Sequence, residues 1–237
     1  MIARRVLFAV AGVAALAVAL FAARFGWMYY RVSHPQPMHS ALPAGEVAAD
    51  SAQGARLLAE SLHADQAGLM ASFQSQEKLS WCGVASAVTV LGARGDRISQ
   101  DDFFTPRTDA VRSWWRTTFG GMTLAALGGM LAAHGATTRV HYASDETLDS
   151  FRAALARNLA EQGDWIVVNY GRAKLGEKGG GHISPIAAYE PKSDMALLLD
   201  VAGYKYPPHW IAIAKLFVAM NTPDSESHRS RGWLEVK

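Results

Sequence analysis

The sequence contains a single cysteine, Cys82, among 237 residues. One cysteine can form neither a disulfide within the chain nor a cysteine-based zinc site, so both of these structural supports are excluded. The 23 Lys and Arg residues nearly balance the 21 Asp and Glu residues, the formal net charge is +2, and no basic run is longer than a pair. The chain therefore lacks the basic patch typical of nucleic-acid-binding proteins, and we expect no nucleic-acid partner.

The composition is otherwise that of a folded protein, with 50% apolar and 19% charged residues. The length suffices for one globular domain with a substantial core. Residues 33–50 carry three prolines and little hydrophobic periodicity, which predicts a linker. We therefore divide the chain into an N-terminal segment (1–32), a linker (33–50) and a folded domain (51–237).

The N-terminal segment holds one long uncharged apolar run, VLFAVAGVAALAVALFAA, at residues 6–23. As a helix rising about 1.5 Å per residue it would reach roughly 27 Å, close to the hydrocarbon thickness of a bilayer. Trp27, Tyr29 and Tyr30 follow, where an interfacial aromatic belt would lie. A cleaved signal peptide is the alternative, but the run is longer than the usual apolar core of such peptides and lacks a clear cleavage site. We expect an uncleaved, single-pass membrane anchor.

The charges that flank this run suggest an orientation. Arg4, Arg5 and the amino terminus slightly outweigh Arg24 and Arg31. Because positive charge tends to remain on the cytoplasmic side, the N-terminus is expected inside the cell. The folded domain is then expected on the periplasmic, or extracytoplasmic, side of the inner membrane.

Helical patterns come first in the folded domain, and strand patterns follow. Helices are predicted at 53–63, 82–94, 122–134, 144–163 (with Ser144 as N-cap) and 211–220. Strands are predicted at 137–142, 164–170, 182–189, 196–202 and 231–237. This order predicts an α+β fold, with a helical first half and an antiparallel sheet in the second half, rather than repeating βαβ units.

Cys82 begins one of the predicted helices. Unpaired N–H groups and the helix dipole favour a thiolate at this position, and Gly83 would let a substrate backbone approach closely. Gln76 lies six residues earlier, where a side-chain amide can join the nucleophile's own N–H in an oxyanion hole. A lone cysteine more often packs as a small apolar residue, so these residues alone leave both interpretations open.

Among eight histidines, His182 starts a predicted strand directly after the glycine-rich stretch GEKGGG. A base held there would lie at the mouth of a cleft, although a hydrogen-bonded core histidine is the alternative. Asp200 ends the apolar run ALLLD, and burying a carboxylate is costly without a partner. The 18-residue separation suits a return on the adjacent antiparallel strand, so we expect Asp200 beside His182, where it would fix the imidazole tautomer.

Long stretches of the chain, in order, resemble the phytochelatin synthases of the papain-like cysteine peptidase group. They are FQSQEKLSWCGVASAVTVLGA, GMTLAALGGMLAAHG, ASDETLDSFR, VVNYGR, GGGHISPIAAYE, LLLDVAGYKYPPHW and AMNTPDSESHRSRGW, and they cover roughly residues 70–237. The likeness is greatest to short bacterial members that have only the catalytic domain. It implies a papain-like fold with Cys82 as nucleophile, His182 as acid/base, Asp200 as the orienting group and Gln76 as oxyanion donor.

The resemblance also implies a reaction, that of a glutathione γ-glutamylcysteinyltransferase. Cys82 would attack the Cys–Gly amide of glutathione, and His182 would protonate the departing glycine. The γ-glutamylcysteinyl thioester would then be resolved by water, giving γ-glutamylcysteine, or by a second glutathione, giving a phytochelatin. The cysteine-rich C-terminal region of plant members is not found in this sequence, which favours hydrolysis.

Substrate contacts are expected around the same cleft. The planar guanidinium of Arg231 would pair with the glutamyl carboxylate and Asp224 with the glutamyl amine, although Arg231 also suits an ordinary strand edge. By analogy with the family, Asn169, Tyr170 and Arg172 would lie nearby.

The resemblance further bears on cofactors and partners. No cofactor and no protein-bound metal are expected for the chemistry, and Cd, Zn or Cu ions would stimulate it only as thiolate complexes of glutathione. Glutathione and a lipid bilayer are the expected partners, and a homodimer is compatible with the sequence. Two other functions stay open: a papain-like peptidase acting on a peptide, and a non-catalytic anchored module that binds glutathione or metal–thiolate complexes.

Overall fold

A seven-stranded sheet organises the body of the protein in the computed structural model, which describes the backbone of residues 2–237 and the side chains of residues 8 and 10–237. The strands are β1 (Val47–Ala48), β2 (Thr138–Tyr142), β3 (Trp165–Gly171), β4 (Gly181–Glu190), β5 (Met195–Leu198), β6 (His209–Ala212) and β7 (Gly232–Val236). Their order is β1-β6-β5-β4-β3-β7-β2, and every neighbouring pair is antiparallel. The predicted α+β class is confirmed.

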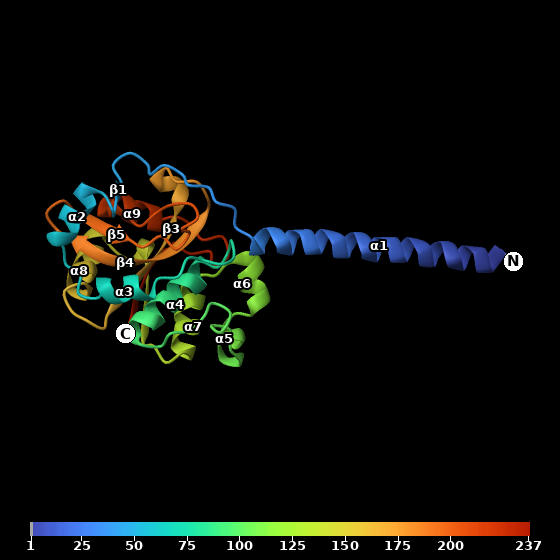
Figure 1. Cartoon of the computed structure of the whole chain (residues 1–237). Helices are drawn as coiled ribbons and strands as arrows, with labels where there is room; N and C mark the ends of the chain where they lie inside the picture. Colours follow the sequence, from blue (N-terminus) through green and yellow to red (C-terminus); the bar gives the residue numbers. More distant parts are fainter. Residues whose placement is uncertain (1) are drawn as a thin grey trace.

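Helices pack around this sheet and supply most of the first half of the body (Figure 1). They are α2 (Ala52–Ala59), α3 (Gln66–Ser72), α4 (Cys82–Arg94), α5 (Pro106–Val111), α6 (Trp114–Gly120), α7 (Leu124–Ala133), α8 (Leu148–Asn158) and α9 (Ile213–Met220). Short 3-10 turns, η1 (Ala143–Asp145) and η2 (Arg172–Leu175), follow β2 and β3.

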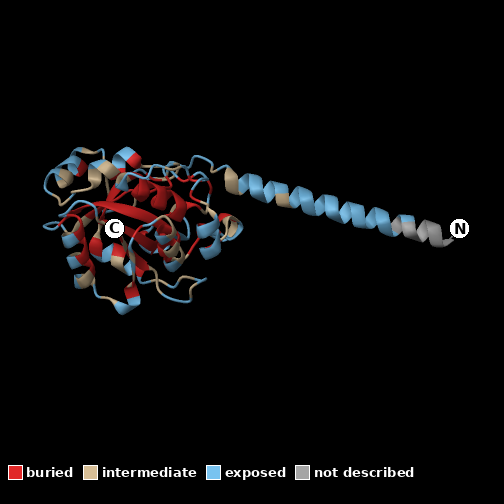
Figure 2. Cartoon of the chain, turned by 90° about the horizontal axis from the view of Figure 1, so that it is seen from below, coloured by how far each residue is buried: buried red, intermediate tan, exposed pale blue. Residues whose placement is uncertain are grey.

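The sheet has an apolar core on each face, as the buried strands of Figure 2 show. Successive residues of a strand point to opposite faces. Val167 therefore joins the core formed with α4 and α7, while Ile166 and Val168 join the core formed with α8 and α9. Burial on both faces explains why β3 reads as a nearly continuous apolar run.

Helix α8 begins three residues later than its sequence pattern suggested. Ser144 was expected to cap it, but this residue lies in η1, where its N–H donates to Ser230 Oγ at 2.9 Å. Thr147 is the N-cap instead and forms a capping box with Ser150. The tight turn that leaves β2 uses residues 143–145 before a helix can start.

The N-terminal helix α1 (Ile2–Ser33) projects from the body (Figure 1). Its stretch Val10–Ser33 is the one helix in the described part of the chain that is long and apolar enough to cross a membrane, and none of that stretch is buried. Length and composition alone support this inference. The side chains of Arg4 and Arg5, which entered the expected orientation, lie outside the described residues.

The body-side end of α1 rests on the folded body. The ring of Phe25 lies 5.8 Å from the rings of both Trp115 and Phe119 on α6. At the end of the helix the Val32 carbonyl accepts a hydrogen bond from Leu79 N–H at 2.9 Å. Helix α1 thus reaches the loop that leads into α4.

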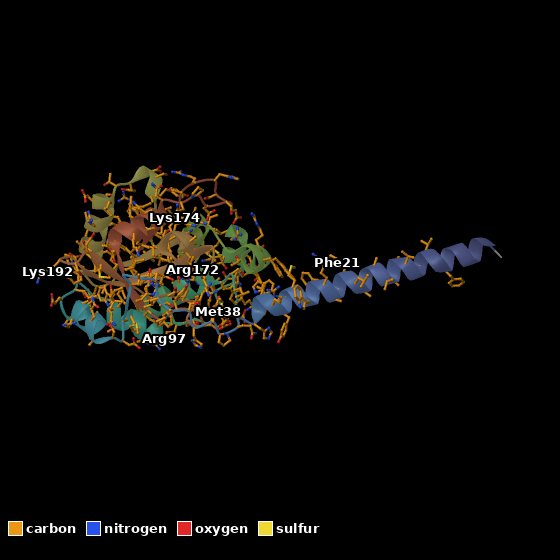
Figure 3. The ribbon with its side chains drawn as sticks, turned by 90° about the horizontal axis from the view of Figure 1, so that it is seen from above. Phe21, Met38, Arg97, Arg172, Lys174 and Lys192 are labelled. Atoms are coloured by element: carbon orange, nitrogen blue, oxygen red, sulfur yellow. The ribbon has the colours of Figure 1, made fainter. Side chains whose placement is uncertain are left out.

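The segment that we expected to be a linker lies along the body for most of its length. Met38 N–H donates to the Tyr204 carbonyl at 2.8 Å, and Ser40 N–H donates to the Lys205 carbonyl at 2.9 Å. Figure 3 shows Met38 against the body and Phe21 on the projecting helix α1. The segment ends in β1, which extends the sheet beside β6. Residues 38–48 are therefore part of the folded unit.

Candidate active site

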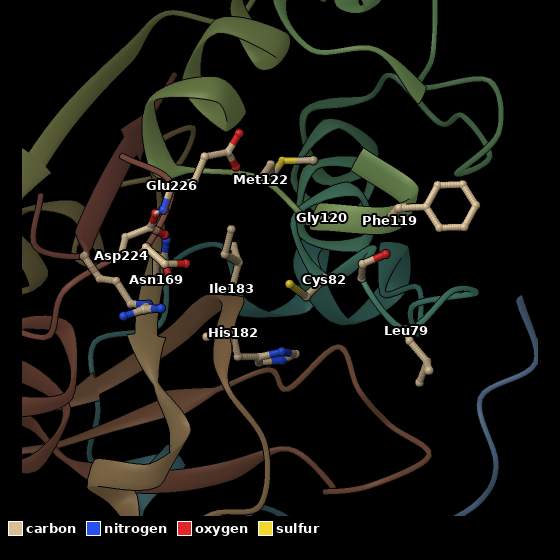
Figure 4. Close-up of a pocket in the computed structure, with 15 residues that line it drawn as sticks. Leu79, Cys82, Phe119, Gly120, Met122, Asn169, His182, Ile183, Asp224 and Glu226 are labelled. Atoms are coloured by element: carbon tan, nitrogen blue, oxygen red, sulfur yellow. Dashed lines mark hydrogen bonds between the residues drawn. The ribbon is translucent and has the colours of Figure 1, made fainter. Parts of the chain in front are cut away.

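Cys82 is the first residue of α4 and lines a cavity of about 380 Å³ (Figure 4). The loop before it is fixed by Trp81, whose fully buried indole donates to Thr118 Oγ1 at 3.0 Å. Lys78 Nζ lies 3.4 Å from the centre of the same ring. Since the helix behind Cys82 is buried along most of its length, the sulfur is held at a rigid helix N-terminus.

His182 faces Cys82 from the start of β4 (Figure 4). Its neighbour across the sheet is Tyr170 on β3, whose ring lies edge-on at 5.7 Å. His182 Nε2 is 2.9 Å from Asp200 Oδ1, and the ring also hydrogen-bonds the Cys82 thiol. The imidazole therefore connects the sulfur to a carboxylate.

Asp200 lies just beyond β5 and is completely buried. Its carboxylate accepts two hydrogen bonds from Arg172 Nη2, at 2.8 and 2.7 Å, and one from Ala202 N–H at 2.8 Å. Burial raises the pKa of Asp200, but the charges and hydrogen bonds of His182 and Arg172 outweigh this and hold the pKa far below its ordinary value. Asp200 is thus a permanent anion beside the imidazole.

The electrostatics favour a thiolate–imidazolium pair. Burial raises the pKa of the Cys82 thiol, but the hydrogen bond and charge of His182, the Ile183 backbone and Arg172 together bring the pKa below its ordinary value. Burial and Arg172 lower the pKa of His182, but Asp200 and Cys82 outweigh them, so its pKa is raised. Both shifts favour transfer of the proton from the sulfur to the imidazole.

Three of the residues expected to contact substrate line the cavity, namely Asn169, Asp224 and Arg231. Arg231 Nη1 donates to Thr222 Oγ1 at 3.0 Å and to the Pro223 carbonyl, while its Nε is buried without a partner among the described residues. The opposite charges of Arg231 and Asp224 suit a ligand with both a carboxylate and an amine.

Besides Asp200, four other expected site residues lie outside the lining of this cavity. Gln76 Nε2 donates to the carbonyls of Lys78 and Leu79, at 3.0 and 2.9 Å, so its amide braces the loop before Cys82. Tyr170 is fully buried against His182. A Cβ at Gly83 would come 2.5 Å from Met122 Sδ, so this buried glycine leaves room for the methionine side chain that lines the cavity.

Arg172 is the fourth of these residues. It is buried behind Asp200, where it also pairs with Glu177. Burial lowers the pKa of Arg172, but its interactions with Tyr170, Asp200 and Glu177 outweigh this and raise the pKa above its ordinary value. The guanidinium is therefore always charged. Arg172 therefore holds the Asp200 carboxylate in place and does not line the cavity.

Two charged residues near the cavity, Glu226 and Arg112, were not expected from their sequence context. Glu226 lines the cavity and pairs with Arg112 at 2.5 Å and with Arg116 at 3.2 Å. The partners are more than a hundred positions apart in the chain, so no local spacing connects them. The nearness of Glu226 to Asp224 in a polar loop was the only available signal.

Comparison with known proteins identifies the family of the chain. The phytochelatin synthase family model matches residues 38–233. Glutathione γ-glutamylcysteinyltransferase 1 of Triticum aestivum is 34% identical over 217 residues, which are 87% of this chain and 42% of the relative. The enzyme of the same name from Lotus japonicus is 32% identical over 220 residues, again 87% and 42%.

A more distant relative is the glutathione γ-glutamylcysteinyltransferase of Schizosaccharomyces pombe, 24% identical over 206 residues, or 81% of this chain and 49% of the relative. The chain spans less than half the length of each of these relatives. The family model nevertheless covers most of the folded body, from the segment before β1 into β7. The chain belongs to the phytochelatin synthase family.

Proposed function

We propose that the protein is a glutathione γ-glutamylcysteinyltransferase-like thiol enzyme that cleaves the Cys–Gly amide of glutathione. The observation that carries this proposal is the Cys82–His182–Asp200 arrangement at a cavity with both an arginine and carboxylates. The volume, about 380 Å³, lies in the range of small-ligand sites. The names of the curated relatives support glutathione as the substrate.

Acylation begins with attack of the Cys82 thiolate on the carbonyl carbon of the Cys–Gly bond. The C–S bond forms, and the carbonyl oxygen becomes an oxyanion. The His182 imidazolium then gives its proton to the amide nitrogen, the C–N bond breaks, and glycine leaves. A γ-glutamylcysteinyl thioester remains on Cys82, and His182 is left neutral.

Deacylation uses the neutral imidazole as a base. His182 takes a proton from water as the water oxygen adds to the thioester carbonyl, and the C–S bond then breaks. γ-Glutamylcysteine leaves, and the thiolate–imidazolium pair is restored. We propose that water is the main acceptor; a second glutathione, whose amine would give a phytochelatin, is the other. Cd, Zn or Cu ions would enter this step bound to glutathione thiolates.

The oxyanion is proposed to lie between the Cys82 backbone N–H and the Gln76 side chain. The first N–H groups of a helix have no partner within the helix, so the Cys82 N–H is free for this purpose. Gln76 Nε2 donates to two loop carbonyls, and one of these hydrogen bonds must open for it to reach the oxyanion. Until then Gln76 keeps the loop in position.

The glutamyl end of the substrate is proposed to lie against Arg231 and Asp224. Arg231 is close to Gly181, where a Cβ would come 2.8 Å from Arg231 Nη2. The absence of a side chain at Gly181 therefore leaves room for the guanidinium beside His182. Asn169 adds an amide to the same wall.

A papain-like fold is the finer description that we propose for the body. A cysteine at the start of a buried helix faces a histidine on an antiparallel sheet, and a buried group orients that histidine. This division of the nucleophile and the base between a helical part and a sheet part supports the proposal. The proposed domain runs from residue 51, with residues 38–50 packed against it.

We also propose that α1 anchors the protein in a membrane, with the body on the periplasmic side. The rings of α6 continue the aromatic end of α1: Trp115 is 55% exposed and stacks on Phe119 at 5.6 Å. Exposed tryptophan beside an apolar helix suits the interface between lipid and water. The active-site cavity, lined in part by Phe119, would then open close to the membrane surface.

Mass spectrometry of the protein mixed with glutathione tests the proposed activity. We expect free glycine in solution and a γ-glutamylcysteinyl adduct on the wild-type chain, with neither on Cys82→Ala. The ratio of γ-glutamylcysteine to phytochelatin measures how much of the thioester goes to water. Cleavage of unrelated peptides without glycine release from glutathione would instead indicate a peptidase. Glutathione binding without turnover would indicate a binding module.

A further inference from the structure

A second cluster of titratable groups lies behind the active site, on the far side of Arg172. Glu46 comes from the segment before β1, Glu177 follows η2, and His209 is the first residue of β6. One ligand atom from each lies within 4.8 Å of the others. All three side chains are completely shielded from solvent.

The polar atoms at the centre of this cluster have no hydrogen-bond partner among the described residues. They are both carboxylate oxygens of Glu46, Oε1 of Glu177 and Nε2 of His209. Buried polar atoms are nearly always paired, and each exception calls for an explanation such as an ion. Unpaired atoms from three residues, one of each within 4.8 Å of the others, indicate a binding site for a ligand.

The tautomer of His209 indicates that the ligand carries a positive charge. His209 Nδ1 lies 2.9 Å from the Pro207 carbonyl, which can only accept, so Nδ1 carries a proton. In the neutral ring, Nε2 then directs a lone pair at two carboxylates. Metal-binding histidines use this same arrangement, with the outer nitrogen donating to a carbonyl and the inner nitrogen free.

The distances fit a small divalent cation. His209 Nε2 is 3.4 Å from Glu177 Oε1 and 3.7 Å from Glu46 Oε2. Bonds of about 2.0–2.1 Å in a tetrahedron place neighbouring ligand atoms about 3.3–3.4 Å apart. One nitrogen and two carboxylate oxygens are also a donor set that zinc accepts, whereas Mg²⁺ and Ca²⁺ prefer oxygen ligands alone.

We propose that Glu46, Glu177 and His209 bind one Zn²⁺ ion, with a water molecule in the fourth position. This site contains no sulfur and is separate from the active-site thiol. Burial raises the pKa of Glu46 to about 7, although the charge of His209 lowers it. A proton on Glu46 is therefore the natural competitor of the ion.

The position of the site gives the ion two structural effects. It joins Glu46, in the segment that follows α1, to β6 and so holds this segment against the body. It also fixes Glu177, whose other oxygen pairs with Arg172, the residue that holds Asp200. The ion thus stabilises the charged residues behind the base without touching the substrate.

Zinc binding to the full chain in detergent tests the proposal. The protein is stripped with EDTA and dialysed, and ZnCl2 is titrated in a buffer that does not bind metal, with the bound zinc counted by elemental mass spectrometry. The test uses the Cys82→Ser background, because Cys82 and His182 are themselves zinc ligands by type. This background is inactive, so the result does not depend on the proposed enzymatic function.

We expect one zinc ion per Cys82→Ser chain and affinity weakened about 100-fold or more by Glu46→Gln, which keeps the shape of the side chain but removes its charge. Glu161→Gln, at an exposed glutamate, should leave zinc binding unchanged. His209→Gln provides a second loss of a ligand, and circular dichroism of the stripped proteins checks that the variants fold.

Two results would overturn the proposal. One is the absence of stoichiometric zinc on the folded Cys82→Ser chain, which would assign the cluster to shared protons. The other is zinc that binds the wild-type chain but is lost in Cys82→Ser and kept in Glu46→Gln, which would place the ion at the active-site thiol.

Discussion

At the scale of single residues, the active site depends on where one proton lies. His182 sits between an acid whose pKa is lowered, Cys82, and a permanently charged carboxylate, Asp200. The sequence alone indicated these three residues by local context: a helix start, a strand start after glycines, and a carboxylate after an apolar run. The structure brings all three together.

Other residues of the site could not be predicted because their roles depend on distant parts of the chain. Arg172 pairs with Asp200, 28 positions away, and its orientation was set by folding rather than by local pattern. The buried cluster of Glu46, Glu177 and His209 likewise draws on three separate segments. Only packing decides which side of a strand or loop such groups occupy.

The thiolate–imidazolium pair predicts how thiol reactivity depends on pH. The thiol pKa is lowered and the His182 pKa is raised, and both shifts favour a thiolate beside an imidazolium. Alkylation of Cys82 by iodoacetamide should therefore stay fast below the ordinary thiol pKa of about 8.5 and fall only when the thiolate is protonated at lower pH.

Replacing His182 should shift the pH at which Cys82 alkylation becomes fast to a higher value. In His182→Ala the hydrogen bond and positive charge are lost while burial, which raises the thiol pKa, remains. The rate measured by intact-mass spectrometry should then rise only above a pH of about 8.5. If the variant kept the wild-type dependence of alkylation rate on pH, the assigned interaction between His182 and the Cys82 sulfur would be contradicted.

We expect Asp200→Asn to slow the chemical step through His182 rather than to weaken substrate binding. The amide removes a charge that supports the imidazolium and leaves Arg172 with one carboxylate partner, Glu177. We expect kcat for glycine release to fall by about 10²–10⁴-fold with a smaller change in KM. Asp96→Asn, at an exposed aspartate, is the control, and near-normal kcat in Asp200→Asn would contradict the role.

At the scale of elements, the predicted pieces with strong periodicity agree with the structure. The strands β2, β3, β4 and β7 and the helices α4, α7 and α9 lie close to their expected ranges. Strand β6 was not predicted, and its last two residues, Ile211 and Ala212, fall in the range expected for the next helix. Its extended form depends on pairing with β5 on one side and β1 on the other.

The capping residue at the N-terminus of α8 should contribute measurably to the stability of the protein. Thr147 Oγ1 accepts a hydrogen bond from Ser150 N–H at 3.1 Å, so Thr147→Ala should lower the free energy of unfolding by about 1 kcal/mol. Ser144→Ala, at the residue first expected to be the cap, should change it by only a few tenths. Urea unfolding compares the two variants, and equal losses would contradict the assigned cap.

At the scale of the whole molecule, α1 is joined to the active site. Its last turn bonds to Leu79, a residue that lines the cavity, and Phe25 contacts Phe119, another lining residue. The sequence predicted the apolar helix from its length, but it could not predict this contact, which connects segments far apart in the chain. The proposed anchor is therefore in direct contact with the loop before Cys82 and with the wall of the cavity.

The proposed orientation can be measured because the chain has only one cysteine. In a Cys82→Ser background, Glu161→Cys places a single thiol on the exposed surface of the body. With the cytoplasmic N-terminus favoured by the flanking charges, a membrane-impermeant maleimide should label this thiol in intact bacterial spheroplasts as fully as in lysed ones. Labelling that appears only after lysis would place the body in the cytoplasm. Labelled protein released into the soluble fraction would show that α1 does not anchor it.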